Sequence, residues 1–245
     1  MTSQAKMATG ALILYNGTVY AELTEINPPS YSVEKVDATS HDSSYKVSIA
    51  GQAAFGDLSF KANFVNDTSQ AALRVLALAK TVGTWRIVNT VASGLPTYSI
   101  PGFISSYTQV GPLKGAPASM SVTITPTESV TEVTTACTNL TTPFLVLTKN
   151  ETGTVTAVPA ASATEYVLDY TMPQATVASY TLTPTATSGT IYVNGTIVAT
   201  GQASSAITYT LALFPTGSIK TDFVVVDVAG SKPAIYRLRL TRGTA

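Results

Sequence analysis

The sequence predicts a mainly β protein with a single α-helix, divided into two β-rich domains. Short segments in which apolar and polar residues alternate recur along the whole chain, as half-buried strands require. Hydrophobic residues make up 45% of the chain and charged residues only 11%, with Thr, Ser, Val and Tyr abundant. This composition favours strands over helices and is too apolar for disorder. Only residues 68–81 show clear helical spacing.

The clearest alternation lies in residues 57–64 and 119–125. The apolar positions there are Leu58, Phe60, Ala62, Phe64, Met120, Val122 and Ile124, and the polar positions are Asp57, Ser59, Lys61, Asn63, Ser119, Ser121, Thr123 and Thr125. Residues 45–49 and 102–110 alternate less regularly. We expect a sheet with one apolar, buried face, here called the dry face, and one polar, solvent-facing face, here called the wet face.

The helix is expected over Thr68–Thr81. Asp67 and Gln70 resemble a capping box, and Gly83 stands where a C-terminal stop is expected. The apolar stripe consists of Ala72, Leu73, Leu76 and Ala79, widened by Val75 and Leu78. A helix with so few charges needs cover on more than one side, so we expect its own sheet on one side and a neighbouring subunit on another.

Residues 27–46 form a polar segment that begins with Pro28-Pro29. Unstructured loops of about this length are uncommon in compact domains and are often functional. Two interpretations remain open, namely an arm that becomes ordered only against a partner and a simple mobile hairpin loop.

The C-terminal part predicts a β-sandwich. Residues 126–141 are rich in Thr and lack a period, which indicates a linker. Short strands follow at turn-punctuated intervals, beginning at Tyr166, Tyr180, Ile191, Ile207, Phe223 and Ile235, and Asn194-Gly195 is a strong hairpin signal. About seven short strands in roughly 100 residues is typical of a β-sandwich. The expected limits are a first domain at 1–127, a linker at 128–141 and a second domain at 142–245.

The sequence contains no constellation for catalysis, cofactor binding or metal binding. His41 is the single histidine, and its neighbours Ser40 and Asp42 are too close in sequence to form a triad with it. Cys137 has no second thiol, which excludes an internal disulfide and a cysteine-based zinc site. The remaining acidic residues are scattered. We therefore expect a protein that is not an enzyme.

Charge and hydropathy exclude two further classes of partner. The chain has 14 basic and 14 acidic residues and no basic cluster, so it lacks the cationic footprint that grips nucleic acid. We expect no signal peptide, because the apolar stretch at residues 10–15 is too short, and no apolar run is long enough to cross a bilayer. Dispersed surface charge protects a monomer against self-association, and a subunit of a polymer has less need of that protection. The low charge of this chain therefore favours a subunit of a polymer.

Residues 22–125 resemble the tail tube proteins of lambda-like siphophages. The matching features, in order, are Glu22-Leu-Thr-Glu-Ile, the polar arm, Gly51-Gln52, Gly56-Asp57-Leu-Ser-Phe60, the helix start Gln70-Ala-Ala-Leu, Gly102-Phe-Ile-Ser-Ser-Tyr and the strand at 118–125. Residues 142–242 resemble the cadherin-like, immunoglobulin-like β-sandwich repeat of bacteria, through Tyr166-Val-Leu, Tyr180-Thr-Leu-Thr, Tyr192-Val-Asn-Gly-Thr and Tyr236-Arg-Leu-Arg-Leu-Thr-Arg242.

The resemblance implies a structural subunit of a non-contractile tail. Its fold would be a tail-tube β-sandwich or barrel-forming domain with one helix, followed by an immunoglobulin-like decoration domain. Hexameric rings would stack into a tube in the virion tail, assembled in the host cytoplasm, and DNA would pass through without specific binding. Other partners would be the tape measure, tail terminator and baseplate or tip proteins, with no cofactor and no membrane.

Two sets of residues then become candidate sites. The predicted lumen lining is Asp57, Ser59, Lys61, Asn63, Ser119, Ser121, Thr123 and Thr125, with Asp57 expected to offset Lys61. The predicted ring-stacking arm residues are Glu34, Lys35, Asp37, His41, Asp42 and Lys46, and the interleaved lysines depart from the more acidic lambda-type arm. An alternative function is a surface adhesin whose C-terminal domain binds a ligand such as a glycan through Tyr166, Tyr170, Tyr180, Tyr192 and Tyr209.

Overall fold

The computed structural model describes residues 11–20, 23–42, 44–64, 68–89, 96–111, 118–135, 140–149, 154–157, 165–172, 177–210 and 219–242. In this part of the chain the protein is mainly β with one α-helix, as the sequence predicts. The chain divides into two compact units. The sheet unit comprises Tyr20–Ile87 and Tyr98–Thr131, and the sandwich unit comprises Met1–Val19, Val88–Thr97 and Glu132–Ala245.

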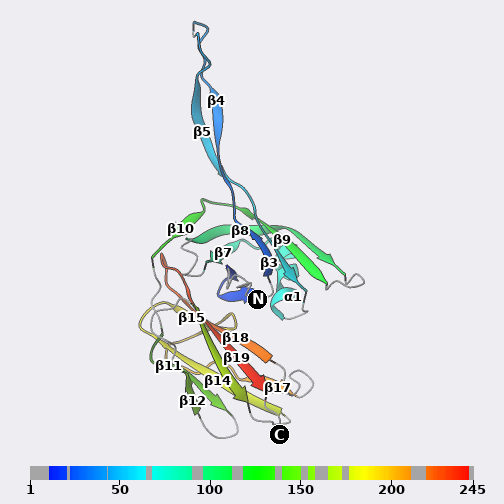
Figure 1. The fold of residues 1–245 in the computed structure, drawn as a ribbon, viewed down its shortest axis with the longest axis vertical. Coiled ribbons are helices and arrows are strands. Elements are labelled where there is room, and N and C mark those ends of the chain that lie inside the picture. The colour runs from blue at the N-terminus through cyan, green and yellow to red at the C-terminus, as the bar shows by residue number, and fades with distance from the viewer. Residues whose placement is uncertain are drawn as a thin grey trace, which may run out of the picture. The chain divides into compact units, whose positions relative to one another are not determined.

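The sheet unit is built on antiparallel strands in the order β7-β8-β9-β6-β3 (Figure 1). Their bounds are β3 (Leu23–Asn27), β6 (Leu58–Asn63), β7 (Gly83–Val88), β8 (Thr97–Val110) and β9 (Ser119–Pro126), and β10 (Thr131–Val133) follows β9. A register shift lies between Ile104 and Ser106 of β8. Central strands β9 and β6 are far apart in sequence, so the pairing of the two predicted alternating segments depends on long-range contacts.

One face of this sheet is dry, as the alternation predicts. Its fully or almost fully buried side chains are Leu58, Phe60, Ala62, Met120, Val122 and Ile124, joined by Trp85 and Ile100 from β7 and β8. Helix α1 (Thr68–Ala79) adds Leu73, which is also fully buried. Burial of such side chains stabilises the unit by about 1.5–3 kcal/mol each.

The predicted start of the helix at Thr68 is confirmed, whereas its predicted end at Thr81 needs correction, because α1 ends at Ala79. At the N-terminus, Asp67 lies outside the described residues, and Gln70 is buried and donates from Nε2 to the carbonyl of Asn63 at 2.8 Å. At the C-terminus, Lys80 takes the left-handed conformation (φ 52°) and Gly83 starts β7 instead. The Lys80 and Thr81 N–H groups donate to the carbonyls of Ala77 and Leu76, both at 3.3 Å, which is the pattern of a Schellman motif.

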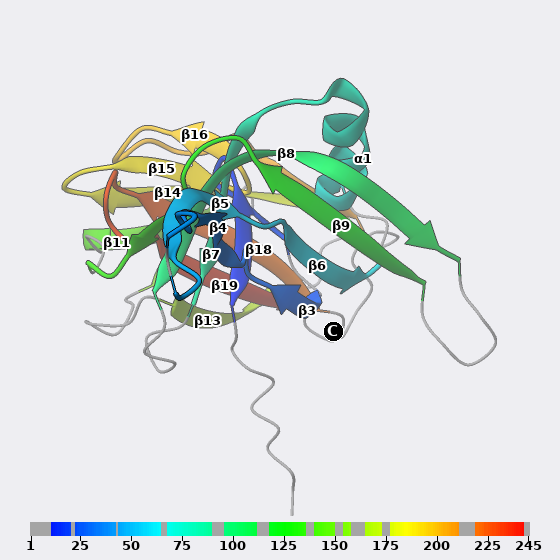
Figure 2. The ribbon, with the colours of Figure 1, turned by 90° about the horizontal axis from the view of Figure 1, so that it is seen from above.

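The polar segment forms a hairpin, as the second interpretation has it, but a hairpin of two paired strands and not a simple loop. β4 (Tyr31–Asp37) pairs antiparallel with β5 (Ser48–Phe55) in a separate two-stranded sheet, here called the arm. The expected strand at 45–49 thus begins only at Ser48. The arm projects away from the sheet that contains β3, β6 and β9 and from α1 (Figures 1 and 2).

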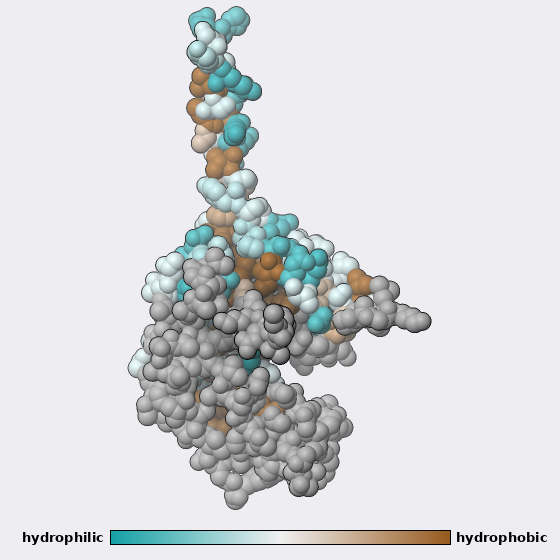
Figure 3. All heavy atoms as spheres, viewed as in Figure 1, coloured by the Kyte–Doolittle hydropathy of each residue, from teal (hydrophilic) through white to brown (hydrophobic). Residues whose placement is uncertain are grey.

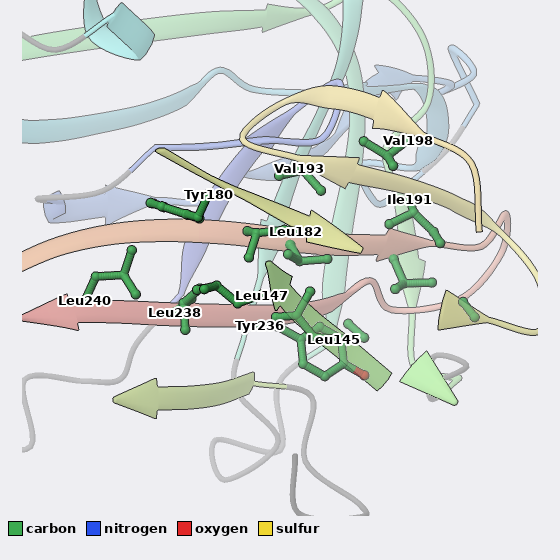
Figure 4. Close-up of a cluster of buried hydrophobic side chains, with 14 residues drawn as sticks. Leu145, Leu147, Tyr180, Leu182, Ile191, Val193, Val198, Tyr236, Leu238 and Leu240 are labelled. Atoms are coloured by element: carbon green, nitrogen blue, oxygen red, sulfur yellow. The ribbon is translucent and has the colours of Figure 1, made fainter. Parts of the chain in front are cut away.

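The sandwich unit contains two sheets around one core. One sheet has the order β12-β11-β14-β17 and the other β13-β19-β18-β15-β16. Their bounds are β11 (Leu140–Lys149), β12 (Thr154–Ala157), β13 (Glu165–Met172), β14 (Val177–Ala186), β15 (Thr190–Val193), β16 (Thr196–Val198), β17 (Ile207–Thr210), β18 (Ile219–Asp227) and β19 (Ala234–Arg242). Apolar side chains from both sheets meet in a single buried cluster, which confirms the predicted β-sandwich (Figure 4).

All six strands predicted in this unit are present, whereas β11 and β12 were not predicted. β11 begins at Leu140, inside the expected linker, and reads Leu-Thr-Thr-Pro-Phe-Leu-Val-Leu-Thr-Lys, which lacks regular alternation. The predicted hairpin turn at Asn194-Gly195 is confirmed, because both residues have positive φ (49° and 82°), as a type I′ turn requires.

A second hairpin of the same kind lies near the N-terminus. β1 (Leu12–Tyr15) and β2 (Thr18–Tyr20) are joined by Asn16-Gly17, whose φ values of 47° and 77° repeat the same turn. Leu14 and Val19 form a buried cluster with Val88, Val225 and Ile235. The sandwich unit therefore includes residues that the expected limits of 1–127 and 142–245 assign to the first domain.

Candidate assembly surfaces

The wet face of the sheet unit brings together all eight side chains of the predicted polar set. Ser59, Lys61 and Asn63 of β6 lie opposite Thr123, Ser121 and Ser119 of β9, so the six share one face. The remaining two are joined by a hydrogen bond, in which Thr125 Oγ1 donates to Asp57 Oδ1 at 2.8 Å. The two alternating segments thus form one continuous polar surface.

Two polar residues of β3 extend this surface and were missed by the sequence analysis. Glu25 lies opposite Lys61, and Asn27 lies opposite Ser59. Asn27 Nδ2 donates to Ser59 Oγ at 3.3 Å and to Glu25 Oε1 at 2.8 Å. The sequence contains no clear signal for them, because Leu23 and Ile26 are three residues apart and a register shift lies between Leu23 and Glu25.

The expected charge partner of Lys61 is wrong. Lys61 Nζ contacts Glu25 Oε2 at 2.7 Å, whereas Asp57 bonds Thr125. The physical reason is the register, because directly opposed residues on paired strands have Cβ atoms about 4.5–5.5 Å apart. The hydrogen bonds from Lys61 and Asn27, together with the charge of Lys61, hold the pKa of the Glu25 carboxyl below its ordinary value.

The charges on the wet face offset one another. Arg86 of β7 lies opposite Ser99 of β8, on the same side as the polar set. Glu25 and Asp57 therefore balance Lys61 and Arg86, and hydroxyl and amide groups supply most of the remaining polar atoms. Such a surface is hydrated but has little net attraction for a polyanion.

The arm exposes all the predicted stacking residues. Those side chains are Glu34, Lys35, Asp37, His41, Asp42 and Lys46. Asp37 organises the turn, since its Oδ1 accepts hydrogen bonds from the Thr39 N–H at 3.0 Å and from Thr39 Oγ1 at 2.5 Å, and Lys46 Nζ lies 3.6 Å from its Oδ2. These hydrogen bonds from Thr39, more than the contact with Lys46, hold the pKa of Asp37 below its ordinary value.

The arm also exposes large apolar side chains that the sequence analysis did not include among the site residues. These are Tyr31, Val33, Val36, Tyr45, Val47 and Ile49. Figure 3 shows hydrophobic residues gathered along the arm, from its base toward its tip. A two-stranded hairpin that stands alone has no other element packed on either of its faces. These apolar side chains therefore stay in contact with solvent in the single chain.

The helix α1 carries a second exposed apolar surface. Val75 and Leu78 are 64% and 76% exposed, and Val82, just after the helix, is 58% exposed. These residues lie on the side of the helix away from buried Leu73. One side of the helix is thus buried and another exposed, and cover by a neighbouring subunit stays a prediction.

The described residues offer no arrangement suited to chemistry. His41, Ser40 and Asp42 are all exposed in the arm turn, and Cys137 lies outside the described part of the chain. No group of three or more His, Cys, Asp or Glu side chains that could hold a metal ion occurs among the residues described. The one helix that the structure describes is not long and apolar enough to cross a membrane.

The tyrosines considered for ligand binding are in part core residues. Tyr180 is almost fully buried and donates its hydroxyl to Asp222, which is itself buried. Asp222 also accepts from Asn194 Nδ2 at 2.8 Å, so the pair anchors the β15–β16 turn. Tyr192 is half-buried, and the side chains of Tyr166, Tyr170 and Tyr209 lie outside the described part.

Comparison with known proteins gives structural likenesses only. No protein-family model matches the sequence, and no curated protein matches it. A chain of the virion of a native gene transfer agent particle is 18% identical, with a TM-score of 0.45, over 53% of this chain and 100% of that chain. A chain of an extracellular contractile injection system, in a structure of its sheath/tube terminator, is 11% identical, with a TM-score of 0.44, over 55% of this chain and 100% of that one.

A third solved structure covers more of the chain. The Dit protein of phage SPP1 is 14% identical over 91% of this chain and 82% of its own, with a TM-score of 0.32.

Proposed function

We propose that the chain is a structural subunit of the tail tube of a non-contractile bacteriophage, in which hexameric rings stack into a channel that conducts DNA during genome ejection. The single observation that carries the proposal is the continuous polar face of β3, β6 and β9, on which Lys61 is paired with Glu25. The exposed apolar surfaces of the arm and of α1 in the same unit supply the means of assembly.

The polar face suits the lining of a DNA channel. Each lysine or arginine that engages a phosphate adds counterion-release affinity, and a long tube would multiply that affinity until DNA could not slide. Lys61 is held by Glu25 at 2.7 Å, and its neighbours across the β6–β9 pair are serine, threonine and asparagine. Asp57, Ser59, Lys61, Asn63, Ser119, Ser121, Thr123 and Thr125 are therefore proposed to face the lumen.

The edges and the arm suit assembly from identical copies. β3 ends the strand order of this unit, and joining such an edge to a neighbouring copy removes unpaired backbone groups. The arm, including Glu34, Lys35, Asp37, His41, Asp42 and Lys46, is proposed to connect one ring with the next. A head-to-tail interface that repeats along an axis produces an open filament.

The sandwich unit is proposed to be an immunoglobulin-like domain. β11, β14 and β17 pair in the order expected for strands A, B and E of that fold, and β15, β18 and β19 in the order of C, F and G. The protein is proposed to reside in the virion tail after assembly in the host cytoplasm. The tape measure, tail terminator and baseplate proteins would be its partners there.

Microscopy with site-specific labelling tests the proposal. Purified protein should form rings or tubes of uniform bore. In a Cys137→Ser background, Ser121→Cys should react with a protein-sized maleimide before assembly and be protected within tubes, whereas the exposed Thr187→Cys should react in both states.

Two outcomes would overturn the proposal. Labelling of Ser121→Cys on the outside of intact tubes would exclude it from the lumen. Monodisperse monomers that bind a glycan would instead favour the adhesin alternative, which the burial of Tyr180 in the sandwich core disfavours.

A further inference from the structure

We propose that the arm of one copy docks on helix α1 of a second copy, through one face of the arm formed by Glu34, Val36 and Ile49. This inference rests on the proposed function and names the partner surface of the arm. The partner of each surface is thus a second copy of the same protein. Because two different surfaces meet, the contact is head-to-tail.

The three arm residues share one face. Val36 lies directly opposite Ile49 in the register of β4 and β5, and Glu34 lies two residues before Val36 on the same strand. Gly51 confirms the grouping, because a Cβ at that position would lie 2.7 Å from Val36 Cγ2 and 3.2 Å from Glu34 Cβ. The face therefore presents two exposed aliphatic side chains with a carboxylate beside them.

The helix presents the complementary pattern. Val75 and Leu78 are one turn apart and strongly exposed, and Arg74 stands four residues before Leu78, which places them side by side on the helix surface. Residues 68–82 contain Arg74 and Lys80 and no acidic residue. Two aliphatic side chains with a cation beside them thus match two aliphatic side chains with an anion beside them.

Charge favours the helix over a second arm as the partner. Residues 31–49 contain three acidic residues (Glu34, Asp37, Asp42) and two lysines (Lys35, Lys46), a net charge of −1 with His41 neutral. Two such arms would repel weakly, whereas the helix segment carries +2. Charge complementarity of this kind fixes which surfaces meet.

A single chain does not make this contact with itself. The arm projects away from the sheet, and α1 lies apart from it in both ribbon views (Figures 1 and 2). Together the arm and the segment 75–82 hold nine of the eleven exposed large hydrophobic residues found in the described part of the chain. Docking would cover Val36 and Ile49 of one copy and Val75 and Leu78 of the other, and it would leave a free arm and a free helix at opposite ends of the growing assembly.

Cysteine cross-linking between two variants tests the contact. In a Cys137→Ser background, Val36→Cys protein and Leu78→Cys protein are mixed, assembled and oxidised. Disulfide-linked dimers containing one of each variant are expected, and the matched control Ile197→Cys, which is 68% exposed on β16, should not cross-link with Val36→Cys. Dimers of Val36→Cys with itself as the main product would overturn the inference.

A charge-reversal pair gives a second measurement. Glu34→Arg and Arg74→Glu should each raise the protein concentration needed for assembly about tenfold, and the double variant should restore it toward the native value. Tubes that form without the mixed cross-link would overturn this inference and leave the proposed function standing. A mixed cross-link in protein that never forms rings or tubes would support the contact between arm and helix and would contradict the proposed function as a tube subunit.

Discussion

The two hairpins β1–β2 and β4–β5 are both pairs of adjacent strands, but they differ in their turns and have opposite surroundings. In the first, Ile13, Leu14 and Tyr15 are buried and the turn is the two-residue Asn16-Gly17. In the second, every residue of β4 is exposed, and a long turn ordered by Asp37 and Thr39 joins the strands. Both hairpins contain several apolar side chains, so apolar content alone does not decide which is buried.

The difference shows how one element can serve stability or assembly. A two-stranded hairpin is at best marginally stable in water, so each needs support from outside itself. The N-terminal hairpin obtains it from Val225 and Ile235 of the sandwich unit. The arm continues from β3 and β6 of its own unit and leaves its apolar side chains uncovered. Substitutions in the first should therefore affect folding, and substitutions in the second should affect association.

The largest expected effect is at Leu14. Leu14→Ala should lower the free energy of unfolding by about 2–5 kcal/mol, because it leaves a cavity in a cluster where Leu14 is 3% exposed. Val36→Ala in the arm should change it by less than about 0.5 kcal/mol. Calorimetry of unassembled protein measures both, and equal losses would mean that the arm is also part of a core.

The turn of the N-terminal hairpin should be nearly as sensitive. A Cβ at Gly17 would lie 2.1 Å from Tyr192 Cγ, on a backbone with φ +77°. Gly201 has a similar φ (+70°) with no atom within 4 Å of its Cβ position, so Gly201→Ala isolates the backbone strain at about 1 kcal/mol. Gly17→Ala should destabilise by about 1–3 kcal/mol more, because a close-packed site must shift. Urea denaturation of the two variants side by side would reveal whether Tyr192 can move aside freely.

A substitution in the arm turn should change local properties only. Thr39→Val removes the hydroxyl that donates to Asp37 and that accepts from the Val47 N–H at 2.9 Å. The pKa of Asp37 should rise toward its ordinary value, while the unfolding temperature of the protein stays unchanged. Carboxyl-detected NMR titration follows Asp37, and a pKa that does not move would assign the shift to the backbone N–H of residue 39 and to Lys46 instead of the hydroxyl.

The smallest effect is expected at the base of the arm. The pKa of Glu25 is lower in the folded protein than in the unfolded chain. The contact with Lys61 therefore stabilises the fold at pH values above the pKa of Glu25 in the unfolded chain. This stabilisation is lost as the pH falls through the pKa of Glu25 in the folded protein. Glu25→Gln should therefore be slightly less stable at neutral pH and equal to the native protein in acid. The exposed position of both side chains keeps the difference small. Thermal unfolding at several pH values measures it, with Glu128→Gln, at an exposed residue, as the control.

Several elements could be predicted from the sequence because their causes are local. The alternation in 58–63 and 120–124 identified both strands and their dry faces, and Asn194-Gly195 identified a turn that needs two positive φ values. The same reasoning applied to Asn16-Gly17 would have found the first hairpin. The helix end was missed because Lys80, not a glycine, takes the left-handed conformation, stabilised by two hydrogen bonds to carbonyls of the last turn.

The sequence by itself determined which residues alternate, where the chain can turn and that the protein carries little charge. Only the tertiary structure decided that β3 pairs with β6, so that Lys61 contacts Glu25 and not Asp57. It also decided that the N-terminal hairpin is buried on the sandwich and that the arm is not. The reason is that turns and strand faces depend on residues a few positions apart, whereas register and burial depend on contacts between segments far apart in the chain.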